Sequence, residues 1–254
     1  SVEAASDMTV TAFVEFLNGT GSNHAAVSAP GRDILVNTRT DTTAKVFGQI
    51  KFTVDGLSFL STDVENRMNI ASTVNLGAYT ELSAGNDLSI AALIGSIYAL
   101  ASAYSETGSI INTQSRPTAE VNVTAKAWIR GAENAKLSAA NLLSLVAATA
   151  ENNNIYTKAY SYGFTAGGTG SVVSKAVNNT KLYGQIDILG DQSELHGKDI
   201  YVSASAPRES EVQYRKEAKY RAETVTEFVK QTVERITTTI EKVAEKVIKW
   251  LPWP

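Results

Sequence analysis

The sequence predicts a mainly β protein, a parallel β-helix solenoid followed by a long C-terminal amphipathic α-helix. Three observations lead to this: a repeat with a period near 55 residues, period-2 alternation within each repeat, and a change of composition after Pro207. Residues 1–207 carry 13 Lys/Arg and 18 Asp/Glu, whereas the 47 residues of 208–254 carry 10 and 8. We therefore divide the chain into a β-helix at 1–207 and a tail at 208–254.

Each repeat begins with a turn and continues as an alternating strand. The anchors Gly31, Gly85, Ala140 and Gly197 are 54, 55 and 57 residues apart. Apolar residues follow three and five positions later and a small residue or Thr seven positions later, which is the pattern of a half-buried strand. The turn residues of the three clear copies are Gly31, Asp33, Gly85, Asp87, Gly197 and Asp199.

Two all-β repeat architectures are compatible with this period. A propeller blade has four strands in about 40–50 residues, so four copies would just close a ring. The inward positions, however, are rich in alanine, as in Ala91, Ala92 and Ala99, and suit a narrow stacked interior. We therefore expect a parallel β-helix, with two or three coils in each 55-residue repeat.

The alternating Val/Ile/Ala runs and the segment Leu-Ser-Ala-Gly-Asn-Asp-Leu-Ser-Ile-Ala-Ala at 82–92 resemble a known group of proteins. They are similar to the repeats of filamentous-haemagglutinin-like, leukotoxin-type filamentous adhesins, which are secreted bacterial β-helix surface proteins. The resemblance covers about residues 1–206, and the ending Lys-Trp-Leu-Pro-Trp-Pro is also similar. It implies a right-handed parallel β-helix, an extracellular or cell-surface location, and a stalk or adhesive role. It implies no receptor site, because the repeat motif is a folding motif.

The recurring aspartates allow two interpretations. Calcium-binding β-rolls use Gly-Asp repeats at about nine-residue spacing, whereas Asp33, Asp87 and Asp199 recur once per repeat. In the third copy, Leu142 stands in place of the aspartate. A carboxylate that accepts backbone N–H bonds in a turn is the simpler interpretation, so we expect no metal site.

Composition excludes several kinds of chemistry. The chain has no cysteine, which removes thiol catalysis, disulfides and cysteine-ligated metals. Its two histidines leave little room for imidazole chemistry. His24 lies in a polar loop, and His196 takes the place of Ser83 and Ser138 in other repeats, which predicts that it faces outward. The net charge of −3 provides no basic field for nucleic acid, and no apolar run approaches the roughly 20 residues of a membrane span. We expect neither an enzyme nor a cofactor, and we interpret Ser1 as a processing point or a cut from a longer chain.

A glycan-binding or glycan-cleaving β-helix, similar to polysaccharide lyases and hydrolases, is the alternative function. It would need a flank of aromatic residues beside carboxylates. The best aromatic candidates are Tyr98, Tyr104, Tyr156, Tyr160 and Tyr162. Tyrosines gathered on one exposed face beside Asp or Glu would favour this alternative, and scattered ones would not.

The tail is predicted as one amphipathic helix that begins with a capping box at Ser210-Glu211-Val212-Gln213. Its apolar stripe starts at Tyr214, Ala218 and Ala222 in steps of four. It continues as an assembly seam of Val225, Val229, Val233, Ile236, Ile240, Val243, Val247 and Trp250. Steps of three and four are typical of a coiled-coil seam.

Three partners could cover that seam: the flank of the chain's own solenoid, helices of other chains, or a membrane surface. Glu234, Glu241 and Glu245 interrupt the basic face and disfavour the membrane. The other two stay open, with a slight preference for a homo-oligomer or filament. Host-cell or glycan surfaces are the other expected partners.

Overall fold

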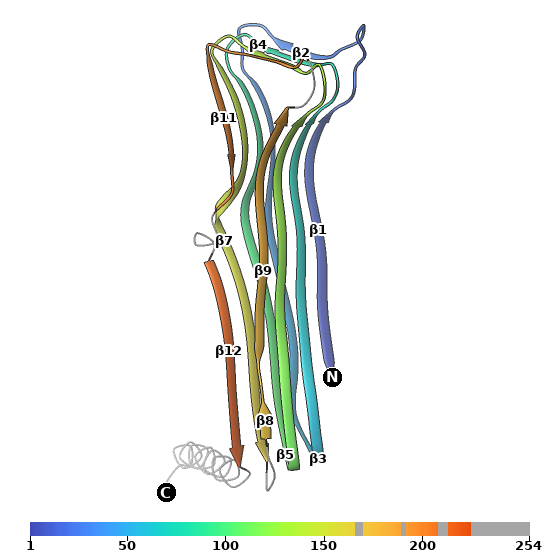
Figure 1. The fold of residues 1–254 in the computed structure, drawn as a ribbon, viewed down its shortest axis with the longest axis vertical. Helices are drawn as coiled ribbons and strands as arrows, with labels where there is room; N and C mark the ends of the chain where they lie inside the picture. The colour runs from blue at the N-terminus through green and yellow to red at the C-terminus, as the bar shows by residue number, and fades with distance from the viewer. Residues whose placement is uncertain (166–169, 189–191, 208–212, 225–254) are drawn as a thin grey trace, which may run out of the picture.

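In the computed structural model, the chain is a long stack of parallel strands that run along the main axis of the molecule (Figure 1). The structure describes residues 1–165, 170–188, 192–207 and 213–224. At 51–58, 110–113, 150–152, 164–165, 170 and 213–224 it describes the backbone alone. The predicted assembly seam, Val225 to Trp250, lies outside the described residues.

The strands follow one another with short connections. They are β1 (Val2–Phe16), β2 (Ala25–Ala29), β3 (Ile34–Leu76), β4 (Thr80–Ala84), β5 (Leu88–Gly131), β6 (Lys136–Ala139), β7 (Leu142–Thr165), β8 (Gly170–Val172), β9 (Lys175–Ile188), β10 (Glu194–His196), β11 (Asp199–Ser205) and β12 (Gln213–Thr224). All pairings between them are parallel.

Each 55-residue repeat forms one coil of a parallel β-solenoid. Ile34 pairs with Leu88, and Leu88 pairs with Leu143, so equivalent positions in successive repeats are hydrogen-bonded neighbours. The expectation of two or three coils per repeat is therefore wrong. Sequence alternation cannot count coils, because it continues through both long arms of the same coil apart from local bulges.

The coils build two facing layers and a small sheet (Figure 1). We call the first layer the descending layer: residues 34–50 of β3, 88–105 of β5, β7, β11 and β12. The ascending layer contains β1, 62–76 of β3, 118–131 of β5 and β9. β2, β4, β6 and β10 form a short sheet that closes one end, the top sheet. An arm of about 17 residues spans about 55 Å, while neighbouring strands are about 4.8 Å apart.

Small and branched side chains fill the narrow space between the layers, as the alanine-rich pattern predicted for Ala92 and Ala99. Ala91, also predicted to face inward, alternates to the outer face and is only half-buried. One apolar cluster near the top sheet includes Leu82, Ile90 and Leu145, each without exposed surface. A second cluster, rich in alanine, lies further along the arms and includes Ala99, Ala101, Ala103, Ala125 and Ala127. Alanine allows the layers to approach closely, so larger side chains at alternate positions must face outward.

The interior becomes polar toward the other end of the arms. Buried Ser161 donates to Ser115 at 2.6 Å, and Ser115 donates to Ser105 at 2.8 Å. Buried Asn66 donates to the carbonyls of Ala44 and Leu100, both at 3.1 Å, and so connects the two layers across the core. These bonds compensate for the cost of burying hydroxyl and amide groups.

The predicted C-terminal helix is not present in the described residues. Residues 213–224, which the prediction placed in the helix, form β12 and pair with Asn154 to Thr165 of β7. The error has a simple cause: steps of four place Tyr214, Ala218 and Ala222 on one face of a helix, but four is also a multiple of the strand period of two. The edge of β7 supplies hydrogen-bond partners for the backbone of residues 213–224, and the solenoid pairing therefore continues to Thr224.

Candidate binding face

The outer surface of the descending layer carries a cluster of tyrosines, and alternation places them there. In β5, Ala99, Ala101 and Ala103 are fully buried, so Tyr98 and Tyr104 point outward. In β7, buried residues alternate with outward ones in the same way. All five tyrosines named from the sequence are half-buried on this one face: Tyr98, Tyr104, Tyr156, Tyr160 and Tyr162. With Lys45, Leu100 and Lys158 they form what we call the tyrosine face.

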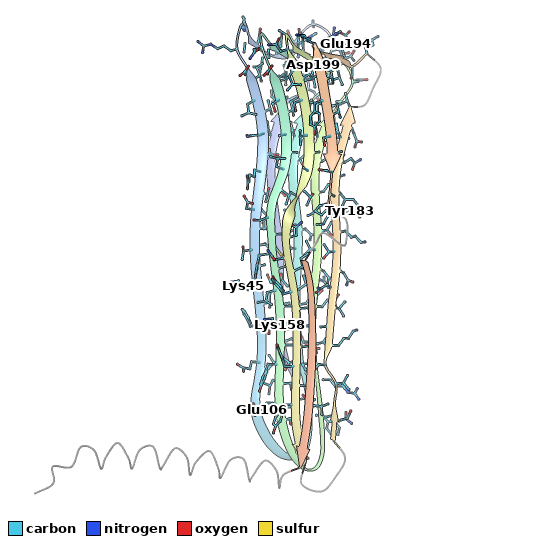
Figure 2. All side chains as sticks on the ribbon, turned by 90° about the vertical axis from the view of Figure 1, so that its left-hand side faces the viewer. Lys45, Glu106, Lys158, Tyr183, Glu194 and Asp199 are labelled. Carbon is cyan, nitrogen blue, oxygen red and sulfur yellow. The ribbon has the colours of Figure 1, made fainter. Side chains whose placement is uncertain are left out.

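The register brings these side chains together across coils. Leu100 pairs with Tyr156 and Tyr104 with Tyr160 in the neighbouring coil. The rings of Tyr98 and Tyr156 are 5.6 Å apart between centroids and tilted by 52°. On the other side, Lys45 Nζ lies 5.1 Å from the centroid of the Tyr98 ring, within cation–π range. Lys45, Tyr98 and Tyr156 therefore form a row of one cation and two rings across three coils. Figure 2 shows where Lys45, Lys158 and Glu106 lie along the arms.

Polar groups border the rings. Tyr104 donates its hydroxyl to Glu106 at 3.0 Å, and Tyr156 donates to Asn154 at 3.1 Å. Burial raises the pKa of the Tyr104 phenol, and the hydrogen bond to Glu106 raises it further. The hydroxyl thus stays protonated and remains a donor at neutral pH. The register of β12 adds Arg215, Lys219 and Arg221 at positions paired with tyrosines of β7.

Carboxylates on this face are not arranged for glycoside hydrolysis. Among its described side chains, Asp41, Glu106 and, at the start of β11, Asp199 are the carboxylates. Asp199 lies in the row of Asp87, nine residues before Ser96 and so about 30 Å from Asp41. Asp41 pairs in register with Ser96, and Glu106 lies ten residues further along β5, which corresponds to about 33 Å. Paired catalytic carboxyls stand about 5–9.5 Å apart. Asp41 is also engaged, because it accepts from Arg39 at 3.0 Å and from Ser96 at 3.1 Å.

The aspartate carboxylates of the repeat turns accept hydrogen bonds, and the backbone N–H groups that donate them belong to the next coil. Asp33 Oδ1 accepts the backbone N–H of Asp87 at 3.1 Å, and Asp87 Oδ1 accepts that of Leu142 at 3.1 Å. Asp33 also accepts from the Asn86 side chain at 2.6 Å. For Asp199, the last of the row, no described residue donates to the carboxylate. The described residues contain no cluster of three potential metal ligands.

The glycines of the turns have different roles. Gly31 adopts φ +69°, a left-handed conformation that favours glycine. Gly85 stands one coil further on, where an added Cβ would lie 1.9 Å from the backbone nitrogen of Gly31. At Gly197, the added Cβ would lie 2.8 Å from the carbonyl oxygen of Asp199. Close approach of backbone, rather than chemistry, explains Gly85 and Gly197.

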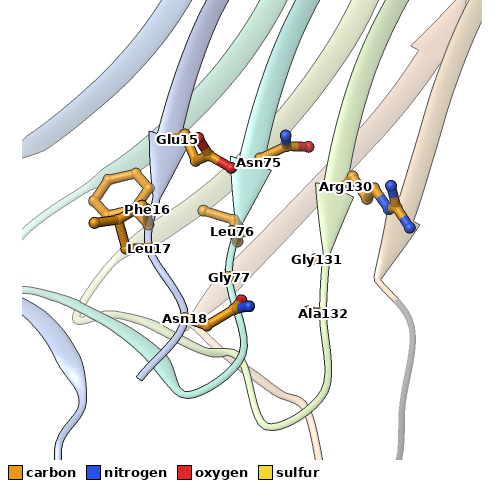
Figure 3. A pocket seen from close by; sticks show the side chains of 10 residues that line it. All are labelled: Glu15, Phe16, Leu17, Asn18, Asn75, Leu76, Gly77, Arg130, Gly131 and Ala132. Carbon is orange, nitrogen blue, oxygen red and sulfur yellow. The ribbon is translucent and has the colours of Figure 1, made fainter. Parts of the chain in front are cut away.

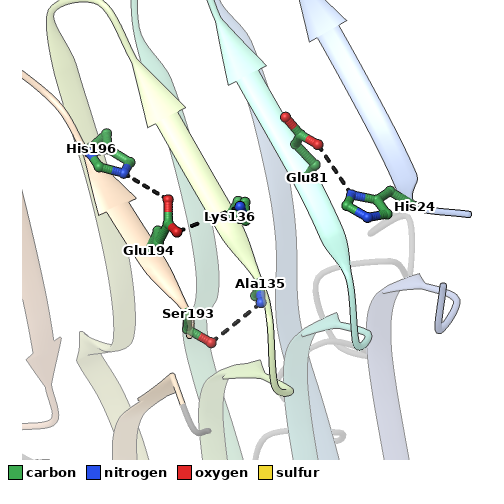
Figure 4. Close-up of polar contacts among 7 residues, drawn as sticks. All are labelled: His24, Glu81, Ala135, Lys136, Ser193, Glu194 and His196. Atoms are coloured by element: carbon green, nitrogen blue, oxygen red, sulfur yellow. Dashed lines mark hydrogen bonds and ion pairs between the residues drawn. The ribbon is translucent and has the colours of Figure 1, made fainter. Parts of the chain in front are cut away.

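The top sheet carries a row of charges that the sequence analysis missed. Glu81, Lys136 and Glu194 occupy equivalent positions in three coils. Lys136 Nζ lies 3.5 Å from Glu194, and both histidines join the row: His24 Nδ1 is 3.3 Å from Glu81 and His196 Nε2 is 3.0 Å from Glu194 (Figure 4). The hydrogen bond from His196, with the charge of Lys136, lowers the pKa of Glu194. Aligning the repeats to this position would have revealed the row.

A shallow pocket of about 370 Å³ lies beside this row. Three of its lining residues, Tyr79, Asn134 and Gln192, adopt φ of 58°, 59° and 68°. They lie at the same turn in three successive repeats, so the left-handed turn recurs with the coil. Left-handed φ is uncommon for Tyr and Gln, and the turn geometry of the solenoid imposes it.

The ascending layer has a second pocket, also about 370 Å³, near the ends of β1, β3 and β5 (Figure 3). Glu15, Asn75 and Arg130 form a row along its rim. Nearby Trp128 is already occupied: Lys126 Nζ lies 3.3 Å from its ring centroid, and its indole N–H donates to Asp187 at 2.8 Å. Lys126 covers this ring more closely than Lys45 covers Tyr98, at 5.1 Å, and the tyrosine face offers a second ring at Tyr156, so it is the better candidate.

No helix of the described residues is long and apolar enough to cross a membrane. No family model, curated protein or solved structure matches the chain, so the site is interpreted from its own geometry.

Proposed function

We propose that the chain is a structural and adhesive segment of a large secreted surface filament, in the form of a right-handed parallel β-helix of the filamentous-haemagglutinin type. The observation that carries this proposal is the parallel pairing that continues from coil to coil. Apart from local register shifts such as those at Thr40/Asp41 and Ile94/Ser96, β3, β5 and β7 pair along the descending arm, and β3, β5 and β9 pair along the ascending arm. Such a stack is stiff and can be extended by adding coils, because each coil contacts only its neighbours.

Localisation on the native cell tests the proposal. An antibody raised against the purified chain should label surface filaments of the organism that makes it, in immunogold electron micrographs of unpermeabilised cells. Label found only after permeabilisation, inside the cell, would refute the proposal.

A second function, glycan binding without cleavage, is supported by the tyrosine face. Its tyrosines share one face, which is one part of the arrangement that the glycan hypothesis required; of the carboxylates that it also required, Glu106 lies beside Tyr104. Aromatic rings pack against the apolar C–H faces of sugars, while Lys45, Lys158 and Asn154 offer hydrogen bonds at their border. The lysines favour a glycan that carries carboxylate or sulfate groups over a neutral one.

A glycan array followed by calorimetry tests this second function. We expect Tyr98→Ala and Tyr156→Ala each to weaken binding at least about tenfold, because each removes one of two adjacent rings. Tyr183→Ala is the matched control, since Tyr183 is 46% exposed on the ascending layer. Equal losses in all three variants, or no glycan bound by the parent chain, would contradict a site at the tyrosine face.

A further inference from the structure

In the described residues, the coil stack ends on each side in a strand edge without a further partner. We define the N-terminal edge as the outer side of β1, β2 and residues 34–50 of β3, and the C-terminal edge as the outer side of β9, β10, β11 and β12. In the described part of the chain, no other strand pairs with either edge. Unpaired edges are templates for further strand pairing.

Exposed apolar side chains gather in the coils that carry these edges. At the N-terminal end they are Phe13, Leu17, Val27, Leu35, Phe47 and Phe59, and at the C-terminal end Val173, Tyr183, Ile200, Tyr201 and Val202. Within the described residues, Leu142 is the one large apolar side chain of this kind in an inner coil. Inner coils thus bury their apolar residues, while both end coils display them.

At the C-terminal edge the core itself is uncovered. Leu88 and Leu143 are fully buried, yet Ile200 in the same row is 49% exposed. Ile90 and Leu145 are also fully buried, whereas Val202 is 52% exposed. These rows end where another coil of the same register would cover them.

We propose that a second copy of this chain supplies that coil, so that copies stack head to tail with the C-terminal edge of one pairing in parallel with the N-terminal edge of the next. The inference rests on the proposed structural function and names its partner. In this arrangement Ile34 and Val36 of the second copy continue the rows that end at Ile200 and Val202. Leu35, which is 68% exposed, meets Tyr201, which is 54% exposed.

The aspartate row supports this register. Within the chain, each carboxylate accepts the N–H of the equivalent residue one coil further on, from Asp33 to Asp87 and from Asp87 to Leu142. Asp199 stands at the same position in the last coil. The equivalent donor is the N–H of Asp33 in a second copy, so stacking would repeat the bond that joins the inner coils.

The charges of β1 and β9, which form the ascending part of the two edges, are complementary. The outward positions of β1 carry Glu3, Asp7 and Glu15, and the edge strand β9 carries Lys175 and Lys181. Glu3 and Lys175 belong to one row, so stacking places Lys175 beside Glu3 of the next copy. The acidic residue of β9, Asp187, already accepts from Trp128 at 2.8 Å and from Gln185 at 2.7 Å. A contact between unlike edges is heterologous and produces an open row of copies rather than a closed dimer.

Sedimentation velocity over a concentration series of the full chain tests the proposal. The parent chain should form dimers, trimers and longer species as concentration rises. Glu3→Lys with Asp7→Lys, and separately Lys175→Glu with Lys181→Glu, should each weaken association at least about tenfold, because like charges then meet at the interface. Mixing the two variants, or combining all four changes in one chain, should restore association, since every contact then joins opposite charges.

The control changes an equivalent charge on an inner coil, with Lys126→Glu, and should associate as the parent does. A parent chain that stays monomeric at every concentration would overturn the proposal. That is the result expected if residues 225–254 of the same chain, rather than a second copy, cover the edge. Oligomers that ignore the edge charges, or variants that fail to rescue each other, would overturn it too. Circular dichroism of every variant confirms folding. Surface labelling of a chain that stays monomeric in solution would refute stacking alone and leave the structural function standing.

Discussion

The carboxylate of Asp87 accepts the backbone N–H of Leu142 at 3.1 Å, although the two residues are 55 positions apart in the chain. They are adjacent because one repeat is one coil, so equivalent turn positions stack directly on one another. The aspartate that marks the repeat in the sequence is thus a connection between coils. Substituting Asp87 therefore measures how much this connection contributes to the free energy of unfolding.

We expect Asp87→Asn to be mild, because the amide oxygen can still accept the N–H of Leu142. Asp87→Ala should lower the free energy of unfolding by about 1–2 kcal/mol, since it leaves that N–H without an acceptor. Chemical denaturation of both variants provides the measurement, repeated with calcium and with a chelator. A stability that depends on calcium in the parent chain and not in Asp87→Asn would overturn the interpretation of the aspartate as a turn acceptor.

Ile90→Asp should be severely destabilising, by about 4 kcal/mol or more, because it places an unpaired carboxylate in a fully buried row. Ser89→Asp is the matched control, because the neighbouring side chain points outward and is only half-buried. Urea unfolding followed by circular dichroism compares the two. Similar stability of both variants would mean that the alternation of β5 is assigned to the wrong face.

Gly85→Ala should disrupt the stacking of the first two turns, because its Cβ would lie 1.9 Å from the backbone nitrogen of Gly31. Backbone atoms cannot move aside as a flexible side chain does, so we expect a loss of about 2–4 kcal/mol. Gly21→Ala is the control, since the nearest atom to its added Cβ is a Tyr79 ring carbon at 3.9 Å. Thermal unfolding of the two variants should differ by several degrees, and equal melting temperatures would show that the turn tolerates a side chain.

The top sheet should lose some stability in acid. The folded-state pKa of Glu194 is lowered by His196 and Lys136, so the unfolded chain takes up a proton there before the folded chain does. The contribution is therefore present above the ordinary glutamate pKa and is lost over the window in which the pH falls from that value through the lower folded one. Melting temperatures of the parent and Glu194→Gln should differ above this window and converge below it. A difference that grows as the pH falls would contradict the assignment.

The sequence predicted what depends on local alternation and on the repeat. A period near 55 residues, with Ile34, Leu88 and Leu143 at matching places, predicted stacked parallel strands, and the pairing of these residues confirms it. Alanine at alternate positions predicted a narrow interior. The match of His196 with Ser83 and Ser138 predicted an outward position, which the exposed imidazole bears out. In each case the information lies within one strand or one repeat.

By itself, then, the sequence determined the parallel strand pairing, the faces of the strands and the positions of the turns, because side-chain alternation and glycine turns act over a few residues. Only the tertiary structure decided the number of coils per repeat, since that depends on where a long arm reverses, and alternation runs on through the arm. It also decided that residues 213–224 pair with β7, because a step of four suits helix and strand equally and the free edge of β7 favours the strand. Finally, it brought Tyr98 and Tyr156 together, which lie 58 positions apart in the sequence, because hydrogen-bonded register across coils converts one repeat length into a single strand spacing.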